Sequence, residues 1–205
     1  MNILYHDAHL LIINKPSGLL SQPGRLIEDS AHYRLRQRFP TVELLHRLDQ
    51  HTSGLMVFAL TPEARKSLAK QFQYREIRKS YQALVYGTLP EQGSLHWPMR
   101  CDWPNRPRQE IHPEGKSATT YWQVLETFQI NGELCTRVEL TPITGRSHQL
   151  RVHMAHMGTP ILGDSLYAHD AALQAYDRLC LHAHVLGFQH PLSKRPMHFV
   201  CEPEF

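Results

Sequence analysis

The chain has 205 residues, of which 41% are hydrophobic and 20% charged, as in ordinary folded globular proteins. This composition excludes a fibrous or disordered protein, and no apolar run approaches the roughly 18 residues of a membrane span. The N-terminal segment lacks the basic start and apolar centre of a signal peptide, so we expect a cytoplasmic protein. The length allows one sizeable core, and we expect a single domain over residues 1–205.

The four cysteines indicate reduced thiols rather than a zinc ribbon or a disulfide framework, because they are far apart and form no Cys-x-x-Cys pair. They are Cys101, Cys135, Cys180 and Cys201. The formal net charge of +3 is too small to identify a nucleic-acid partner by itself. The charge is nevertheless uneven: residues 65–79 hold six Lys or Arg against one Glu, and three Arg lie near two Trp within residues 97–108. Each run predicts either a solvated face or contacts to RNA or DNA phosphates.

The first half of the chain predicts short strands and two helices. Residues 3–5 and 10–14 favour strands around a turn, residues 30–39 favour a helix, and residues 55–60 are continuously apolar, as in a buried strand. Thr61-Pro62-Glu63 predicts a second helix start, because Thr is a good N-cap, Pro suits the first position and an acid suits the positive end of the dipole. We expect this helix to pack through one apolar face and to present a basic face to solvent. The apolar face holds Ala64, Leu68 and Phe72, and the basic face holds Lys66 and Lys70.

The second half predicts further strands, which are rich in β-branched and aromatic residues. The expected strands are residues 80–86, 119–128, 136–140, 179–187 and 197–201. Residues 90–116 form a long polar connection with five prolines and three arginines, and a connection of that length is usually functional or disordered. A helix is expected over residues 147–157, ended by Gly158.

The most informative segment is His46 to Gly54, with the sequence HRLDQHTSG. It places Asp49 in a polar loop that ends in glycine and leads into the predicted buried strand. Such a loop can hold a catalytic side chain still while leaving it exposed, because the adjoining strand anchors it. Taken alone, an Asp near an Arg and a His is also typical of a surface ion pair.

A second candidate segment is Gly145 to Arg151. It places Arg146 at a helix N-terminus, where a cation gains nothing from the helix dipole and therefore needs another partner. An acid elsewhere in the fold would supply that partner, either for chemistry or as half of a buried salt bridge that only joins two segments. Both interpretations stay open on these residues alone.

No metal or nucleotide cofactor is predicted. Two histidine pairs have spacings that could bind a metal, His153 with His156 and His182 with His184, but neither HExxH nor a supporting cluster of acids occurs. No segment matches a phosphate-binding loop or a nucleophile elbow. The sequence therefore gives no support to ATP, NAD or flavin chemistry.

Six motifs, in order along the chain, resemble those of the RluA family of pseudouridine synthases. Besides HRLDQHTSG, they are Asn14 to Gly18, Arg78 to Tyr81, GRSHQLRVHM from Gly145, Pro160 to Asp164, and Leu181 to Ala183. The similarity covers nearly the whole chain. Residues 101–107, CDWPNRP, further resemble the founding branch, whose members modify both 23S ribosomal RNA and a transfer RNA anticodon stem-loop.

The resemblance implies an α+β fold with a mixed, largely antiparallel central sheet, flanking helices and a central catalytic cleft. It also implies one catalytic domain without the S4 RNA-binding domain that many relatives carry. The reaction would convert uridine to pseudouridine: the N1–C1′ bond breaks, the uracil rotates and C5 bonds to C1′. No electron or phosphoryl group is transferred in this reaction, so we expect no cofactor. We also expect RNA as the partner, no membrane association, and a monomer.

By the same resemblance, Asp49 would be the catalytic carboxylate, and Arg146 would keep it ionised and oriented. Tyr81 would stack on the flipped base and could move a proton late in the reaction. Arg47 would enter the space that the base leaves. The other expected RNA contacts are phosphate contacts by Lys66, Lys70, Arg106 and Arg108, and apolar walls formed by Leu181 and Ile143.

Other functions stay open at this point. A non-catalytic RNA-binding or chaperone module would account for the basic segments but leaves Asp49 and Arg146 without a purpose. An aspartate-dependent nucleosidase would cleave the base without returning it. Within the synthases, action on only one of tRNA and rRNA is the alternative to dual specificity.

Overall fold

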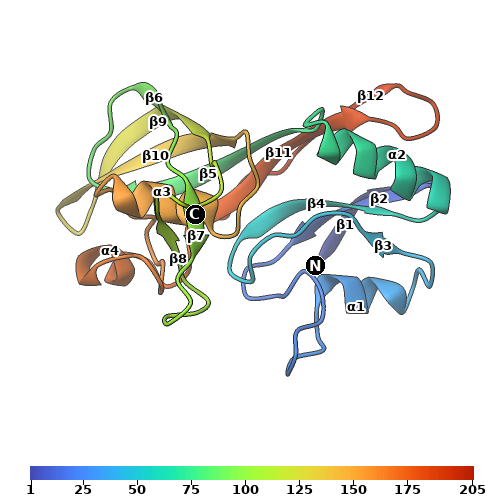
Figure 1. Cartoon of the computed structure of the whole chain (residues 1–205), viewed down its shortest axis with the longest axis horizontal. Helices are drawn as coiled ribbons and strands as arrows, with labels where there is room; N and C mark the ends of the chain where they lie inside the picture. The colour runs from blue at the N-terminus through green and yellow to red at the C-terminus, as the bar shows by residue number, and fades with distance from the viewer. The chain divides into compact units, whose positions relative to one another are not determined.

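The computed structural model describes residues 1–205, which divide into two compact units (Figure 1). Unit 1 comprises residues 1–79 and 182–204, and unit 2 comprises residues 80–181 and Phe205. Each unit has its own hydrophobic core. The expectation of one domain over the whole chain stays a prediction.

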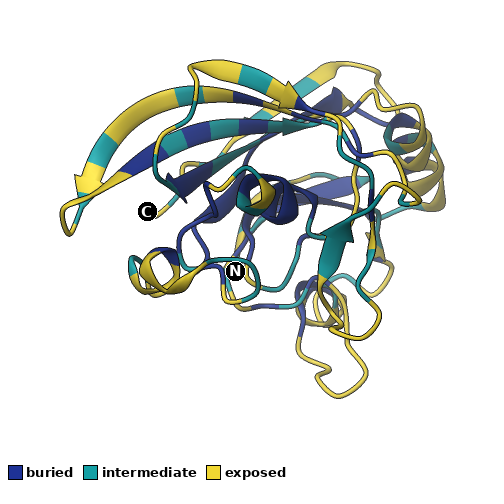
Figure 2. Ribbon diagram, turned by 60° about the vertical axis from the view of Figure 1, so that its left-hand side comes forward, coloured by how far each residue is buried: buried dark blue, intermediate teal, exposed yellow.

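Unit 1 is built around strand β4, which lies between β2 and β11. Its elements are β1 (Asn2–His6), β2 (Leu10–Lys15), α1 (Ala31–Arg36), β3 (Glu43–Leu44), β4 (Ser53–Ala59), α2 (Pro62–Gln73), β11 (Leu181–Gln189) and β12 (Pro196–Val200). β4 pairs antiparallel with β2 and β3 and parallel with β11, while β1 and β12 pair antiparallel with β2 and β11. Every residue of β4 is buried, as its apolar sequence predicts (Figure 2).

The two helices of unit 1 contact opposite faces of β4, because successive side chains of a strand point to opposite sides. Leu55 and Val57 share a core cluster with Leu68 of α2. Phe58 instead stacks with His32 of α1, their ring centroids 6.4 Å apart. Burial of both faces explains why β4 is apolar throughout rather than alternating.

The predicted helix starts of unit 1 are confirmed. Thr61 caps α2, since its hydroxyl accepts from the Ala64 N–H at 3.2 Å and Pro62 occupies the first turn. Lys66 and Lys70 are exposed on the solvent side, as expected. Helix α1 ends earlier than the predicted residue 39, at Arg36.

Unit 2 consists of an antiparallel sheet, a separate hairpin and two short helices. Its elements are β5 (Arg78–Tyr86), whose first two residues belong to unit 1, β6 (Gln92–Leu95), β7 (Met99–Cys101), β8 (Gln109–Ile111), β9 (Thr120–Ile130), β10 (Glu133–Pro142), α3 (Gln149–His156) and α4 (Asp170–Gln174). β10 pairs with β5 and β9, β9 also pairs with β6, and β7 pairs with β8 as a separate hairpin. Both units are thus largely antiparallel, as the fold class predicted.

The expectation for residues 90–116 needs correction. This segment is not a structureless connection: it contains β6, β7 and β8. These strands are only three or four residues long and are separated by proline-containing turns, so they lack the apolar alternation by which strands are recognised. They form because partner strands satisfy their backbone groups, which is a tertiary effect.

Helix α3 is shorter than predicted and begins in an unusual way. Its N-cap, His148, has a φ of 55° and makes no side-chain capping bond. Leu150 and Met154 are buried, and Gly158 ends the helix region with a φ of 82°, as expected. None of the helices is both long enough and apolar enough to cross a bilayer.

One prediction concerns Gly54, which has a φ of 111° and lies against β11. A Cβ at this position would lie 2.4 Å from the Ala183 carbonyl oxygen. Gly54→Ala should therefore lower the free energy of unfolding by more than about 2 kcal/mol, from backbone strain and the clash together. Urea unfolding measures this. Gly132→Ala is the matched control, because Gly132 also has a positive φ but open space around it, and its loss should be about 1 kcal/mol.

A second prediction concerns His46, whose Nε2 accepts from the Val57 N–H at 3.1 Å. Burial and the nearby Lys79 ammonium lower the pKa of His46 to about 3. The unfolded chain therefore binds a proton near pH 6.5 that the folded chain does not, so stability falls as the pH drops from about 6.5 toward 3, by up to about 1.4 kcal/mol per pH unit. His46→Gln should flatten that part of the profile. An unchanged slope in urea titrations at pH 4 to 7 would contradict the assignment.

Candidate active site

Asp49 lies in the loop between β3 and β4, directly before the buried strand. Its carbonyl accepts from the Thr52 N–H at 3.2 Å, which closes a turn. The side chain is partly buried. A hydrogen-bonded turn at the start of a buried strand therefore carries the candidate carboxylate.

The segment after β2 holds this turn through backbone groups on both sides of Asp49. The Ser21 hydroxyl donates to the Leu48 carbonyl at 2.6 Å and accepts from the Leu48 N–H at 3.0 Å. The Gly18 N–H donates to the Gln50 carbonyl at 2.9 Å, and the Gln50 amide donates to the Gly18 carbonyl at 3.0 Å. Both neighbours of Asp49 are thereby fixed.

Lys15 holds the same junction from inside the fold. Its side chain is 0% exposed, and its ammonium donates to the carbonyls of Pro16, Leu19 and Gln50 at 2.9, 2.7 and 2.9 Å. A buried ammonium is tolerated only where its N–H groups find acceptors. The sequence analysis placed Lys15 only in a strand-ending motif and missed this role. A lysine directly after an apolar strand was the available signal.

The two residues before Leu48 have opposite environments. The His46 ring lies 4.9 Å from the Phe72 ring of α2 and is neutral in the folded protein, given its low pKa of about 3. The Arg47 side chain is exposed and forms no salt bridge. Its predicted entry into the space of a flipped base stays a prediction.

Two histidines considered as metal ligands bind a backbone carbonyl instead. The His182 Nε2 and the His184 Nδ1 each lie 2.9 Å from the Cys201 carbonyl, which can only accept. The His182 Nδ1 therefore accepts from the Ser53 hydroxyl at 2.8 Å, which ties β11 to the start of β4. No group of three or more His, Cys, Asp or Glu side chains is arranged to hold a metal ion.

The predicted residues that would contact the flipped base from either side, Tyr81, Ile143 and Leu181, lie in unit 2. Tyr81 sits on β5 opposite Leu140 and is packed at the edge of the core. Ile143 is 40% exposed at the end of β10, whereas Leu181 is 3% exposed and belongs to the core. Leu181 thus offers little surface to a ligand, and both wall roles stay predictions.

Arg146 is exposed in the loop between β10 and α3. Its Nε donates to the Ser117 carbonyl at 3.0 Å. A buried salt bridge is made in the same motif by Arg151, which binds Asp164 through two bonds of 2.8 and 2.7 Å. The pairing of Arg146 with Asp49 stays a prediction.

The buried amide of Gln149 organises the Arg146 loop and was missed by the sequence analysis. Its Oε1 accepts from the Thr144 hydroxyl at 2.7 Å and from the Arg146 N–H at 3.1 Å. Its Nε2 donates to the Thr119 carbonyl at 2.9 Å and to the Thr120 hydroxyl at 3.0 Å. One buried polar side chain therefore fixes the loop backbone against β9.

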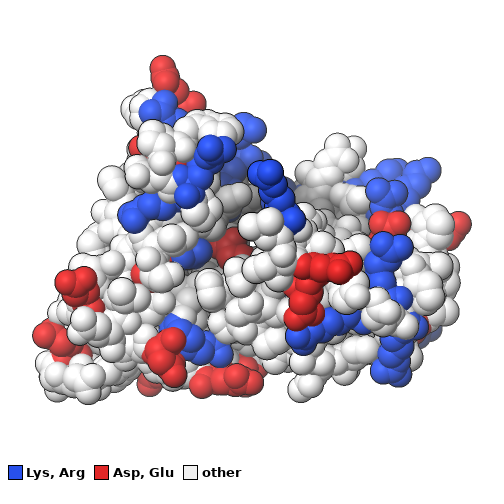
Figure 3. Space-filling model, turned by 90° about the horizontal axis from the view of Figure 1, so that it is seen from below, with Lys and Arg blue, Asp and Glu red and all other residues white.

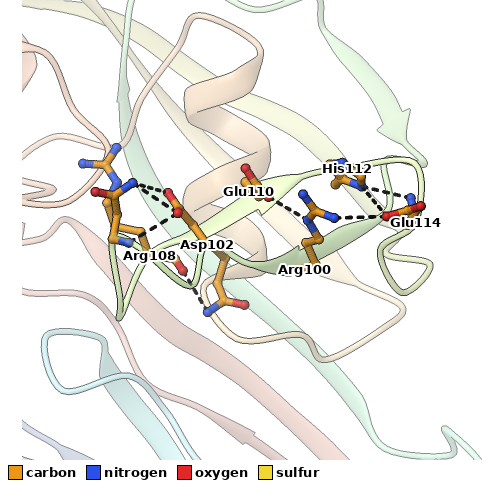
Figure 4. A network of polar contacts seen from close by, with 8 residues as sticks. Arg100, Asp102, Arg108, Glu110, His112 and Glu114 are labelled. Atoms are coloured by element: carbon orange, nitrogen blue, oxygen red, sulfur yellow. Dashed lines mark hydrogen bonds and ion pairs between the residues drawn. The ribbon is translucent and has the colours of Figure 1, made fainter.

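The three arginines that the sequence grouped together have different partners in the β7–β8 hairpin, and Figure 4 labels two of them, Arg100 and Arg108. Arg100 is neutralised, because it pairs with Glu110 at 2.7 Å and with Glu114 at 3.2 Å. Arg106 and Arg108 form no salt bridge and instead lie over the rings of Trp103 and Tyr167, 4.8 and 5.2 Å from the ring centroids. Arg100 is thus removed from the cluster of cations available to phosphates.

Tyr167 anchors the hairpin to the start of α3. Its hydroxyl accepts from the Gln109 N–H at 2.8 Å and lies 2.6 Å from the His148 Nδ1. Burial raises the pKa of Tyr167 to about 12, so the hydroxyl stays protonated. Trp103 at the hairpin tip is 67% exposed. The hairpin therefore has a fixed base and an exposed aromatic tip.

Figure 3 shows basic side chains beside acidic ones on the face that it displays. A cation on this face is therefore available to a phosphate only where no neighbouring acid pairs with it. Among the predicted phosphate contacts, Lys66, Lys70, Arg106 and Arg108 are all exposed and none makes a salt bridge.

Comparison with known proteins identifies the family. The family model for RNA pseudouridylate synthase matches residues 9–156. The chain is 52% identical to the dual-specificity RNA pseudouridine synthase RluA of Yersinia pestis, with 100% of both chains covered. It is 48% identical to the RluA of Escherichia coli K12, covering 99% of this chain and 93% of that protein. The solved structure of human RNA pseudouridylate synthase domain containing 1 covers 100% of this chain and 84% of its own, with a TM-score of 0.86 and 28% identity. The fold is therefore that of the pseudouridine synthases, and the chain belongs to the RluA family of RNA pseudouridine synthases, which are isomerases acting on uridines in RNA.

Proposed function

We propose that this enzyme modifies uridines in stem-loops of both 23S ribosomal RNA and a transfer RNA, in the cytoplasm, with Asp49 as its catalytic carboxylate. Dual specificity is supported by the names of the similar RluA proteins and by the CDWPNRP segment, which the structure places at the end of β7 and in the hairpin loop. Recognition of two different RNAs requires that shape and an accessible uridine, rather than one long sequence, define the target.

The hydrogen-bonded turn around Asp49 is the observation that carries the catalytic assignment. A carboxylate can act as nucleophile or base only when it is positioned within reach of the reacting atoms. The backbone groups before and after Asp49 are tied to the segment after β2, while its side chain is only partly buried. This arrangement gives a fixed carboxylate without enclosing it in the core.

The remaining roles follow from the chemistry of each side chain. Arg146 would orient the carboxylate, for which a planar guanidinium is suited. Tyr81 would stack on the extruded uracil, and Arg47 would stack in the gap that it leaves, which offsets part of the unstacking cost of a few kcal/mol. Arg106 and Arg108 would contact phosphates, with Trp103 available for stacking on an unpaired base.

The first test of the proposal is Asp49→Asn, which keeps the size of the side chain and removes its charge. Single-turnover pseudouridine formation should fall at least about a thousandfold on both a ribosomal and a transfer RNA hairpin, because the reacting group is gone. RNA binding should be largely retained. Nucleoside chromatography of digested RNA measures the product.

The control is Asp29→Asn, since Asp29 is an exposed acid of unit 1 that pairs with Arg34. It should turn over like the wild type. A rate of the Asp49→Asn variant close to that of the wild type would refute the catalytic role. If the wild-type enzyme modified only one of the two hairpins, dual specificity would be refuted. A loss of RNA mass equal to that of uracil less one water, which replaces the base on hydrolysis, would instead identify a nucleosidase. Binding without any product would identify a non-catalytic module.

The second test concerns the hairpin arginines. Arg106→Ala with Arg108→Ala should weaken binding about equally for different RNA sequences, because phosphate contacts carry no base information. The slope of log affinity against log salt should become shallower by about 0.7 to 0.9 per lost contact. Arg137→Gln is the control, because Arg137 already pairs with Glu126 at 2.8 Å. If the wild type, the double variant and the Arg137→Gln control had equal salt slopes, the hairpin arginines would not contact phosphates.

A further inference from the structure

The solvent face of α2 continues into the turn between β11 and β12, both in unit 1 (Figure 1). Gln71 joins them, since its Nε2 donates to the Gln189 carbonyl at 2.8 Å and its Oε1 accepts from the Gln189 N–H at 2.9 Å. The Lys194 ammonium adds a contact to the Ser67 hydroxyl at 3.3 Å. The helix and the turn therefore form one continuous surface, which we call the α2 surface.

Five cations without acidic partners lie on the α2 surface. They are Lys66, Lys70, Arg75, Lys194 and Arg195, all of which are exposed and outside every salt bridge. Two of them are contributed by a turn more than a hundred residues away from the helix in sequence, so the basic run in residues 65–79 shows only part of this surface. Unpaired exposed cations on a single surface are the electrostatic signature of phosphate binding.

The turn that carries Lys194 and Arg195 is rigidly built. The His190 Nδ1 accepts from the Leu192 and Ser193 N–H groups at 3.3 and 3.0 Å, and its Nε2 donates to the Asp7 carboxylate at 2.9 Å. The His190 N–H donates to the Arg195 carbonyl at 2.8 Å. The two cations are therefore presented from a closed turn, which lowers the entropy lost when a phosphate binds.

The backbone conformation at two of these cations independently indicates that they have a functional role. Arg75, just after the end of α2, has a φ of 59°, and Lys194 has a φ of 60°. Glycine or asparagine occupies such left-handed positions at lower cost. Long cations are found instead at both positions, and strained residues of this kind cluster at functional sites.

We propose that the α2 surface binds the sugar-phosphate backbone of the RNA substrate, independently of base sequence, and adds affinity without taking part in the chemistry. This inference rests on the proposed function for the identity of the RNA. Phosphate contacts by several cations supply most sequence-independent affinity for RNA, and they position the nucleic acid without reading it.

The rival explanation is purely structural. A cation near a helix C-terminus gains from the helix dipole, which would account for Arg75, and the Lys194 ammonium donates to the Pro191 carbonyl at 2.7 Å, which would account for Lys194. This explanation predicts losses of stability on substitution, whereas phosphate binding predicts losses of RNA affinity. The two can be measured separately.

The experiment uses the triple variant Arg75→Asn, Lys194→Asn and Arg195→Gln. Asparagine tolerates a positive φ, so the melting temperature should stay within a few degrees of the wild type. Affinity for an RNA stem-loop, titrated at several salt concentrations, should fall. The slope of log affinity against log salt should become shallower by about 2 to 3, because each of the three lost charges contributes about 0.7 to 0.9. The single-turnover rate at saturating RNA should be unchanged.

Arg34→Gln is the matched control, because Arg34 is exposed on unit 1 but pairs with Asp29 at 2.7 Å, and it should leave the salt slope unchanged. If the triple variant is unstable, the double variant Lys66→Gln with Lys70→Gln tests the helix alone, and it should likewise lower RNA affinity and make the salt slope shallower. The inference would be overturned if the slope of log affinity against log salt were unchanged in both variants. It would also be overturned if the single-turnover rate at saturating RNA fell while that slope stayed the same. Binding titrations need no turnover, so absence of pseudouridine from the wild type would refute the proposed function and leave this test intact.

Discussion

The buried ammonium of Lys15 is the interaction on which the geometry of the candidate site depends. It bonds carbonyls of the segment after β2 and also the Gln50 carbonyl, which is 35 residues away in sequence. An uncompensated charge inside a protein costs several kcal/mol, so movement of either segment that breaks these bonds is strongly disfavoured. The backbone beside Asp49 is therefore coupled to the folding of the β2–β4 sheet, and the carboxylate itself does not have to serve as an anchor.

In unit 2 a buried neutral group, the Gln149 amide, fixes the backbone of a loop in the same way. The Gln149 amide satisfies backbone and hydroxyl partners on both the Arg146 loop and β9. Leaving a buried amide unpaired costs about 1 to 3 kcal/mol, so the loop conformation is specified by the need to satisfy Gln149. In both units a buried polar group therefore fixes the backbone beside a candidate site residue, Asp49 in unit 1 and Arg146 in unit 2.

Charge pairing decides which cations can contact RNA. Arg100, Arg34 and Arg137 are balanced by acids, whereas the cations of the hairpin tip and of the α2 surface are not. A net charge of +3 therefore conceals local groups of cations that form no salt bridge. Such groups attract phosphates over a Debye length of about 8 Å at physiological salt, and acids placed beside them would cancel that attraction.

The sequence alone determined the features that act over a few residues. The Thr61 cap, the apolar run that becomes β4, the glycine stop after α3 and the Asp49 loop were all predicted, because capping and strand burial depend on neighbouring residues. The family motifs likewise identified the isomerase. Only the tertiary structure decided the roles of Lys15 and Gln149, the pairing of Arg100, the short strands β7 and β8, and the addition of Lys194 to the cations of α2. The physical reason is that Lys15, Gln149 and Lys194 bind groups 35, 30 and 127 residues away, and a distant partner leaves no local pattern to read. The partners of Arg100 and of the short strands β7 and β8 meet only when their hairpin closes.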